Sequence, residues 1–336
     1  MSFNLKVKLT TLFFALFFFM NAKLKSQEYL VKDAKIVFLG DSITQSGAQP
    51  GGYVTIFDQI VQEKFRELDI EVIGAGISGN KVPQLLSRLD KDVLEKNPTT
   101  VVIYIGINDV WHSEKGQGTP IENFESGLIE LCEKIQASGS KVVLCTPSVI
   151  GESQSNSLDQ ALDRYSEVMR SLAAKFNIKL IDLRQQFVDF LKSNNPLDRD
   201  KNILTSDGVH LNAAGNDFVA EKMLTALGCD YKASKANQVM RHIVLFQFKE
   251  SVSETEIDEI AKAFGQLPDS IDQIIGYEAG TNVSPENLDQ GFTHAFVVTF
   301  RDAKGRDEYL PHPAHKEFVK KLDGKIEKVL VFDFEN

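Results

Sequence analysis

Ile36-Val37-Phe38-Leu39-Gly40-Asp41-Ser42-Ile43-Thr44 begins as an apolar run and becomes polar immediately after a glycine. A short apolar run of this kind predicts a fully buried strand of a parallel sheet. In open parallel sheets, ligands bind beyond the carboxyl ends of the strands, which is where Ser42 would lie. Two interpretations follow: Asp41 and Ser42 cap the next helix, or Ser42 is a nucleophile.

The pattern of the first stretch repeats along the chain. Amphipathic segments separate the strand-like runs, and this alternation predicts a parallel α/β sandwich with a five-stranded sheet. The predicted strands are 35–39, 70–75, 100–105, 141–146 and 178–182. The predicted helices are 53–67, 82–95, 121–137, 157–176 and 213–227.

Composition restricts the class of protein. A chain of 336 residues is long enough for two domains. Its formal net charge is −10, or −14 without residues 1–26, which argues against nucleic acid or an anionic membrane surface as a partner. The three cysteines, Cys132, Cys145 and Cys229, form neither a disulfide framework nor a metal-ligand pattern. We expect no metal and no cofactor.

Residues 1–26 have the features of a secretory signal peptide. Lys6 and Lys8 precede an apolar core at 9–20, which is too short for a membrane span of ~20 residues. Cleavage near Ser26-Gln27 would leave a secreted or periplasmic protein with no stable membrane span after processing. The alternative is an uncleaved membrane anchor, because the cleavage site is not a regular small-x-small pattern.

Three further polar motifs follow later strands or precede the last helix. The turn 74–80 is rich in glycine, which permits tight turns and outward N–H groups. Asn108, in Gly-Ile-Asn-Asp, carries an amide that can stabilise developing negative charge, although these residues also favour ordinary turns. Asp207 and His210 stand three apart, so the carboxylate can orient the imidazole as a general base. Trp111 either lines a pocket or packs in the core.

In this order, Gly-Asp-Ser, a glycine turn, Gly-x-Asn-Asp and Asp-x-x-His resemble the four blocks of the SGNH, or GDSL, hydrolase family over residues 33–228. The resemblance implies a flavodoxin-like three-layer α/β/α sandwich and acyl-transfer chemistry. It makes Ser42 the nucleophile, His210 the general base and Asp207 the residue that orients it. The sequence has no Gly-x-Ser-x-Gly motif, so the other large esterase family is not indicated.

The same resemblance implies an oxyanion hole. Its donors would be the N–H groups of Ser42 and Gly79 and the side-chain amide of Asn108. Gly79 is assigned in preference to Gly76 because the family glycine opens the helix after an Ile-Ser-like step. Asp41, which precedes Ser42, and Trp111, which follows Asn108 by three positions, are assigned to a possible substrate pocket.

A polar linker at 229–239 separates this predicted domain, 27–228, from a second one at 240–336. The second domain begins with an alternating strand at 240–249 and a helix at 253–266. Further strands are expected at 273–280, 292–300 and 327–334. Interleaved strands and helices over fewer than 100 residues predict a compact α+β module.

This module resembles the stress-responsive dimeric α/β-barrel (Dabb) domain through His242, Thr293-His294, Tyr309 and the run His-Pro-Ala-His at 312–315. The resemblance implies a ferredoxin-like fold and a homodimer. Some plant relatives that look like it are polyketide cyclases, and His242, Tyr309 and His315 match the positions of a possible second pocket. The alternative is that these residues define the core and turns of the fold.

The sequence therefore predicts a secreted serine esterase acting on small acyl esters, above all acetyl, on a carbohydrate. The alternatives within the same chemistry are a lysophospholipase or a thioesterase. In an alternative of another class, the chain is a small-ligand-binding or dimerisation protein that works through its C-terminal barrel.

Overall fold

A computed structural model describes residues 29–153, 157–232 and 238–335, so the proposed signal peptide lies outside the described part of the chain. Backbone contacts divide the chain into two compact units. The first takes in the chain through Ile150 together with Ser157–Phe187 and Asn216–Ala233. The second comprises Gly151–Asn156, Val188–Gly215 and Ser234–Asn336, so it includes a stretch that the sequence analysis placed within the first domain.

The first unit is built on a parallel five-stranded sheet with strand order β2-β1-β3-β4-β5. The strands are β1 (Lys35–Gly40), β2 (Glu71–Gly76), β3 (Thr100–Tyr104), β4 (Lys141–Cys145) and β5 (Lys179–Ile181). Residues 36–39 of β1 are completely inaccessible to solvent, as expected for a central strand covered on both faces. The predicted strand set and the parallel sandwich are confirmed.

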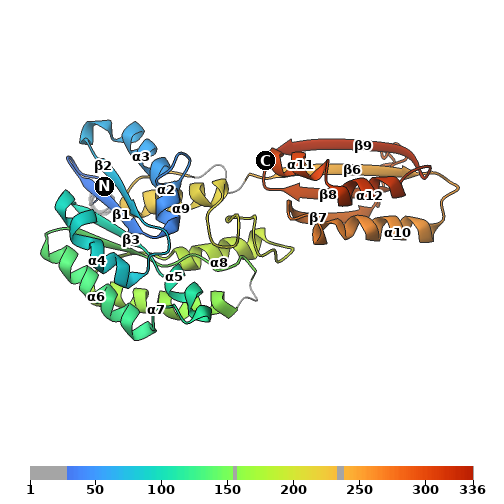
Figure 1. The fold of residues 1–336 in the computed structure, drawn as a ribbon. Helices are drawn as coiled ribbons and strands as arrows, with labels where there is room; N and C mark the ends of the chain where they lie inside the picture. The colour runs from blue at the N-terminus through green and yellow to red at the C-terminus, as the bar shows by residue number, and fades with distance from the viewer. Residues whose placement is uncertain (1–28, 154–156, 233–237, 336) are drawn as a thin grey trace, which may run out of the picture. The chain divides into compact units, whose positions relative to one another are not determined.

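Helices cover both faces of this sheet. The helices α4, α6 and α7 pack side by side on one face, and α3 lies on the opposite face (Figure 1). The predicted helices are α3 (Tyr53–Lys64), α4 (Val82–Asp92), α6 (Ile121–Ala137), α7 (Ser157–Phe176) and α9 (Ala213–Leu227). Short 3₁₀ turns extend some of these helices, η1 (Arg66–Leu68) and η2 (Leu94–Lys96).

Three helices in the described residues between 29 and 228 were not predicted. They are α2 (Ser42–Gly47), α5 (Ile107–Trp111), which leads into the 3₁₀ turn η3 (His112–Lys115), and α8 (Leu183–Asn194). Two of them, α2 and α5, are too short to display a helical repeat in the sequence. The third, α8, did carry a signal, because Leu183, Phe187 and Leu191 recur at a spacing of four and all three are buried.

The sheet register brings three loops to one edge. Gly40, the last residue of β1, is paired with Gly76 at the end of β2 and with Tyr104 at the end of β3. The chain therefore leaves all three strands at the same level. Because the strand order reverses around β1, this edge is the position where open α/β sheets bind ligands.

The second unit contains an antiparallel four-stranded sheet of order β7-β8-β6-β9. Its strands are β6 (Met240–Phe248), β7 (Ile274–Thr281), β8 (His294–Phe300) and β9 (Ile326–Glu335). Its helices are α10 (Glu254–Gly265), η4 (Leu267–Asp269), α11 (Ala303–Tyr309) and α12 (Pro313–Lys321). This order and connectivity confirm the predicted ferredoxin-like module.

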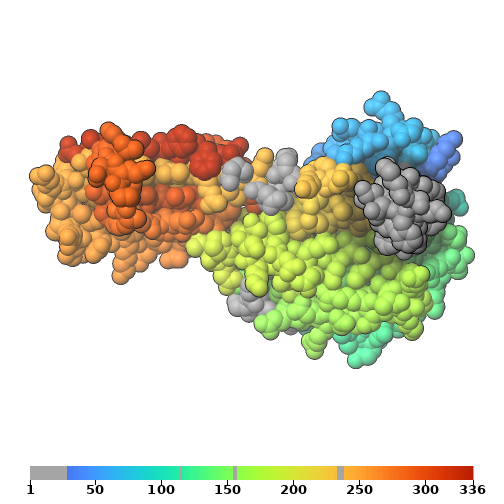
Figure 2. Space-filling view, turned by 180° about the vertical axis from the view of Figure 1, so that it is seen from behind, coloured from blue at the N-terminus to red at the C-terminus, as the bar shows by residue number. Residues whose placement is uncertain are grey.

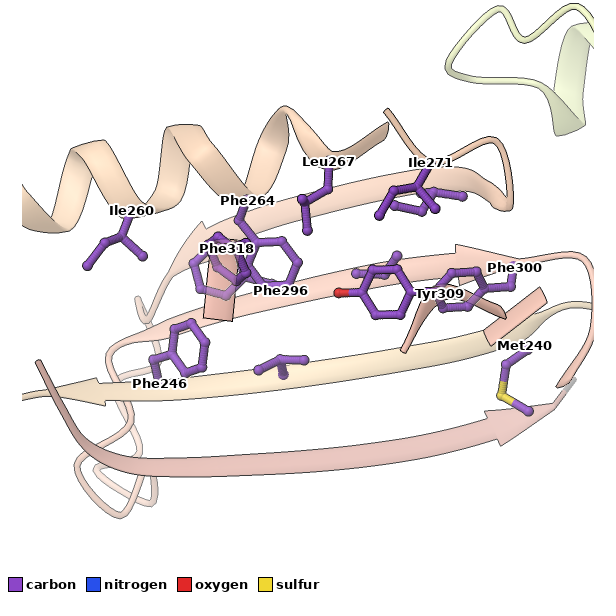
Figure 3. Close-up of a cluster of buried hydrophobic side chains, with 13 residues drawn as sticks. Met240, Phe246, Ile260, Phe264, Leu267, Ile271, Phe296, Phe300, Tyr309 and Phe318 are labelled. Carbon is purple, nitrogen blue, oxygen red and sulfur yellow. The ribbon is translucent and has the colours of Figure 1, made fainter. Parts of the chain in front are cut away.

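Helices cover one face of this second sheet over β6, β7 and β8 and form the core there, whereas Val329 and Val331 of β9 on the same face are exposed. Alternate β6 residues Val244 and Phe246 point into it and meet Phe264 of α10, Phe296 of β8 and Phe318 of α12 (Figure 3). The Phe264 and Phe296 rings stack with centroids 4.7 Å apart, within the range of favourable aromatic contacts.

The other face of the second sheet is apolar and open. Phe332 of β9 pairs with Ile243 of β6, which pairs with Val297 of β8, so the three side chains form one row across the sheet. Phe332 is 59% exposed and Leu330 in the next row is 40% exposed. Figure 2 shows this face, with β9 in dark red and β6 in gold.

Candidate functional site

Ser42 is the first residue of α2, directly beyond the carboxyl end of β1. The preceding residue, Asp41, is 2% exposed and caps the helix, because its Oδ1 accepts a hydrogen bond from the Ile43 N–H at 2.9 Å. The capping interpretation therefore holds for Asp41, and the interpretation of Ser42 as a nucleophile stays a prediction. Gly40 allows α2 to start this close to the sheet, since a Cβ there would lie 2.1 Å from Thr44 Oγ1.

The two glycines considered for the second block have different structural roles. A Cβ on Gly76 would lie 2.1 Å from the Gln45 N atom, so Gly76 permits close approach between the end of β2 and α2. Gly79 has φ +76°, a left-handed conformation that favours glycine, and it is exposed. The choice of Gly79 as an oxyanion donor stays a prediction.

Asn108 lies at the start of α5, beyond the end of β3, and is 4% exposed. Its side-chain amide donates to the Asn80 carbonyl oxygen at 3.0 Å and to Asp41 Oδ2 at 3.3 Å. The structure thus joins the loops that follow β1, β2 and β3 through one side chain. These contacts hold Asp41 between the loops, and its assignment to a substrate pocket stays a prediction.

Asp109, next to Asn108, is a buried acid that sequence analysis did not single out. Its Oδ1 accepts from the Val82 N–H at 3.2 Å, at the start of α4, while its Oδ2 has no hydrogen-bond partner among the described residues. Burial raises the pKa of Asp109 to about 6. Trp111, at the end of the same helix, is 37% exposed and is available as a pocket wall.

Asp207 and His210 form a close pair in the loop before α9. Asp207 Oδ2 lies 2.7 Å from His210 Nδ1, and Asp207 Oδ1 accepts from the His210 N–H at 2.7 Å. Partial burial would raise the pKa of Asp207, but the hydrogen bonds from His210 outweigh it and hold that pKa below its usual value. The pair has the arrangement of an oriented imidazole with an ionised carboxylate behind it.

The segment before that loop is anchored by Glu152, which is 1% exposed. Its carboxylate accepts from the N–H groups of Ile203, Leu204 and Thr205 at 2.7, 2.6 and 2.5 Å. The Thr205 hydroxyl donates to the same carboxylate and accepts from the Gly208 N–H at 3.1 Å. One buried acid therefore fixes the backbone that leads into the Asp207–His210 loop.

The site residues are distributed over both units. Ser42, Gly79 and Asn108 belong to the first unit, and Asp207 and His210 belong to the second. Each group has the local geometry described above, and their joint action as a catalytic triad with an oxyanion hole stays a prediction.

The second unit brings together the residues assigned to a second pocket. The Tyr309 ring lies 4.2 Å from the His315 ring and 5.8 Å from the His242 ring, measured between centroids. Figure 3 shows Tyr309 in the layer between helices and sheet, with its hydroxyl directed along that layer. This hydroxyl is buried without a hydrogen-bond partner among the described residues. His242 is held by Asp333, whose Oδ1 lies 2.7 Å from its Nδ1.

Two further observations concern metals and membranes. Within residues 29–153, 157–232 and 238–335, no three His, Cys, Asp or Glu side chains are grouped so that they could hold a metal ion. The same described ranges contain no helix that combines the length and apolarity required to cross a membrane. The three cysteines are buried and unbridged.

A family profile matches the N-terminal part of the chain. The description "GDSL-like Lipase/Acylhydrolase family" matches residues 38–218, more than half of the chain and inclusive of Ser42, Asn108, Asp207 and His210. The chain belongs to the GDSL-like lipase/acylhydrolase family. It is therefore a serine carboxylic ester hydrolase.

Two relatives of this GDSL-family hydrolase are named as acetylxylan esterases. An acetylxylan esterase from Geobacillus stearothermophilus is 30% identical over 60% of this chain and 97% of its own length. The crystal structure of an acetyl xylan esterase, AlAXEase, is 46% identical over 57% of this chain and 99% of that chain, with a TM-score of 0.56. The Geobacillus enzyme has been solved as catalytic mutants at a serine, an aspartate and a histidine.

The C-terminal part of this GDSL-family hydrolase has its own match. The description "Stress responsive A/B Barrel Domain" fits residues 240–336, which confirms the second resemblance. The stress-response A/B barrel domain-containing protein HS1 of Arabidopsis thaliana is 39% identical over 30% of this chain and 92% of its own length.

Sequence reasoning missed two charged residues, Glu152 and Arg88 of α4. In the sequence each is a single charged residue without a motif, and such residues are usually solvated. Only the fold shows that Glu152 is buried, that Arg88 is nearly buried, and that both bind backbone polar groups.

Proposed function

We propose that this hydrolase is a secreted esterase that removes small acyl groups, chiefly acetyl, from a carbohydrate through an acyl-enzyme. The substrate class is supported by the acetylxylan esterases, which this chain matches over nearly their whole length. The mechanism is supported most directly by the Asp207–His210 pair, with its 2.7 Å contact to the ring nitrogen.

In the proposed mechanism His210 Nε2 takes the proton of the Ser42 hydroxyl while Ser42 Oγ attacks the ester carbonyl. Asp207 keeps the Nδ1 proton in place and stabilises the imidazolium. The alcohol leaves with the proton that His210 returns to it. Water, deprotonated by His210, then attacks the acyl-enzyme; the acyl–Oγ bond of Ser42 breaks, Ser42 takes the proton back from His210, and the carboxylic acid is released. The N–H groups of Ser42 and Gly79 and the Asn108 amide stabilise the oxyanion in both steps.

The catalytic mutants of the Geobacillus enzyme support these roles. The mutated residues are a serine, an aspartate and a histidine, and the last two stand three positions apart, as Asp207 and His210 do here. We assign the corresponding roles to Ser42, Asp207 and His210.

Acetate release from acetylated xylan tests the substrate class. Residues 27–336 should release acetate, and the Ser42→Ala protein should not. If fatty acid is released from a lysophospholipid, or a thiol from an acyl thioester, far faster than acetate from xylan, the lysophospholipase or thioesterase alternative replaces this proposal.

Domain organisation and localisation form part of the proposal. We propose a signal peptide at 1–26, a hydrolase domain at 27–228, a linker at 229–239 and a barrel domain at 240–336. Expression of the full chain with N-terminal sequencing of the exported protein tests this directly. A mature N-terminus near residue 27 is expected, and retention of residues 1–26 on a membrane would contradict it.

We further propose that the barrel domain forms a homodimer through the open face of its sheet. The row of Phe332, Ile243 and Val297 places large apolar side chains on a surface where a single soluble chain would ordinarily present polar ones. A second copy offers an identical apolar face, and two sheets packed face to face bury both. Light scattering on residues 27–336 should give twice the mass of one chain, and a monomer would end this proposal.

A second candidate function concerns the barrel itself. The buried Tyr309 hydroxyl has no partner among the described residues, and its ring contacts the rings of His242 and His315, which favours a polar small-molecule ligand in this layer. A screen of phenolic and polyketide-like acids by thermal shift tests it, with Tyr309→Phe as the matched variant. Ligand stabilisation that Tyr309→Phe abolishes is expected, and equal shifts in both proteins would contradict it.

A further inference from the structure

Arg88 is a nearly buried arginine of α4 that contacts the sheet edge carrying Ser42. Its side chain is 12% exposed. Its Nη2 donates to the Gly40 carbonyl oxygen at 2.8 Å and to the Ala75 carbonyl oxygen at 2.9 Å. These two carbonyls lie at the carboxyl ends of β1 and β2, so one guanidinium nitrogen ties the two strand ends together.

The same guanidinium also holds the turn that carries Gly79. Arg88 Nε donates to Asn80 Oδ1 at 2.8 Å, and Asn80 is the residue after Gly79. The backbone carbonyl of Asn80 in turn accepts the side-chain amide of Asn108 at 3.0 Å. Asn80 is therefore bound by Arg88 on its side chain and by Asn108 on its backbone.

These contacts reach each of the three oxyanion donors of the proposed function. Gly40 stands two residues before Ser42, Asn80 directly follows Gly79, and Asn108 is linked through Asn80. The fourth contact of Arg88, the ion pair with Asp92 at 3.0 Å, lies within α4 and touches none of the three loops.

We propose that Arg88 is a positioning residue that fixes the N–H of Ser42, the N–H of Gly79 and the amide of Asn108 relative to one another. This inference rests on the proposed function, because it takes these three groups as the oxyanion donors. A guanidinium suits the task because its rigid planar fork presents several donors at fixed angles, whereas a lysine ammonium is one point charge on a flexible stem.

Arg88→Lys tests the inference on aryl acetate hydrolysis. We expect kcat to fall by about 10–100-fold with KM changed less than about threefold, since the loss of one whole oxyanion donor typically costs ~10²–10³ in kcat. The rate of inactivation by a diethyl aryl phosphate should fall in parallel, because its phosphoryl oxygen uses the same donors. In Arg88→Ala, added ethylguanidinium should restore part of kcat.

Arg170→Lys is the matched control. Arg170 is also a partly buried arginine of the first unit, and it donates to Asp182 through Nε and Nη2. Its contacts involve none of the three loops, so kcat should stay within about twofold of the wild type. Active-site titration with the aryl phosphate corrects every kcat for the fraction of folded enzyme.

Asn80→Ala keeps the experiment decisive if the Arg88 variants do not fold. It removes the acceptor of Arg88 Nε and leaves the backbone carbonyl that holds Asn108, so a smaller fall in kcat at unchanged KM is expected. Wild-type kcat per active site in Arg88→Lys or Asn80→Ala, with only a lower melting temperature, would show a merely structural arginine and overturn the inference.

The Ser42→Ala protein separates the two levels of the argument. If Ser42→Ala is inactive while Arg88→Lys keeps full kcat, only the role of Arg88 is wrong. If Ser42→Ala retains activity, the proposed function fails, and the inference about Arg88 fails with it.

Discussion

Replacement of the buried acid Asp109 by asparagine should change how the stability of the hydrolase unit depends on pH. Asp109 is completely inaccessible to solvent, and one of its carboxyl oxygens has no partner among the described residues. Burial raises its pKa to about 6 from the ordinary 3.8. Between these two values the folded chain binds more protons than the unfolded chain, so the free energy of unfolding falls as pH rises through this window.

The size of the effect follows from the two pKa values. A difference of roughly two pKa units corresponds to about 3 kcal/mol in total. Part of this is already lost at pH 4.5, so about 2 kcal/mol remains to be lost between pH 4.5 and pH 7.5, with little further change above it. An asparagine side chain at this position cannot ionise, and the Asp109→Asn protein should therefore gain about 2 kcal/mol relative to the wild type across that interval.

Urea unfolding of both proteins at several pH values measures this directly. Trp111 is the only tryptophan of the chain and lies two residues from Asp109, so its fluorescence reports on the unfolding of this part of the fold. Asp90→Asn, at an exposed position of α4, gives the baseline for loss of a carboxylate as such. A difference between Asp109→Asn and wild type that stays constant from pH 4.5 to 7.5, or that shrinks as pH rises, would refute the reasoning.

Three more changes have defined outcomes. Asn108→Ala should lower kcat on aryl acetates by about 10²–10³, because one oxyanion donor is lost; an unchanged kcat would remove Asn108 from the site. Glu152→Ala should lower the free energy of unfolding by about 3 kcal/mol or more, because three buried N–H groups at 203–205 lose their acceptor; an unchanged urea midpoint would contradict this. Phe332→Asp should convert the proposed dimer to a monomer in light scattering without lowering kcat on aryl acetates, and a persistent dimer would place the interface elsewhere.

Much of the fold could be predicted because many strands are either continuous apolar runs or regular apolar–polar alternations in the sequence. Residues 36–39 are apolar without interruption since both faces of β1 are covered, and the alternation at 240–249 reflects a sheet covered by helices on one side. α2 and α5 could not be predicted in this way, because helices of six and five residues complete less than two turns. The Asp41 side chain caps α2, and the Asn108 amide ties α5 to the loops that follow β1 and β2.

Only the candidate site residues that lie in short sequence motifs could be predicted. Asp41 and Asn108 belong to short motifs, and the structure joins them through the Asn108 amide. Arg88 and Glu152 could not be predicted, because their partners are carbonyl or N–H groups up to 53 residues away along the chain. Backbone groups leave no signature in the sequence, so only the fold reveals which charged side chain they need.

The measurement that tests the central claim most directly is hydrolysis of aryl esters from acetyl to dodecanoyl by residues 27–336, beside the Ser42→Ala protein. Fast turnover of the acetyl ester that disappears in Ser42→Ala is the predicted result, and it would establish both the serine mechanism and a small acyl pocket. Faster turnover of the long chains would contradict the acetylesterase assignment. Equal activity in the wild type and Ser42→Ala, at every chain length, would contradict the serine mechanism itself.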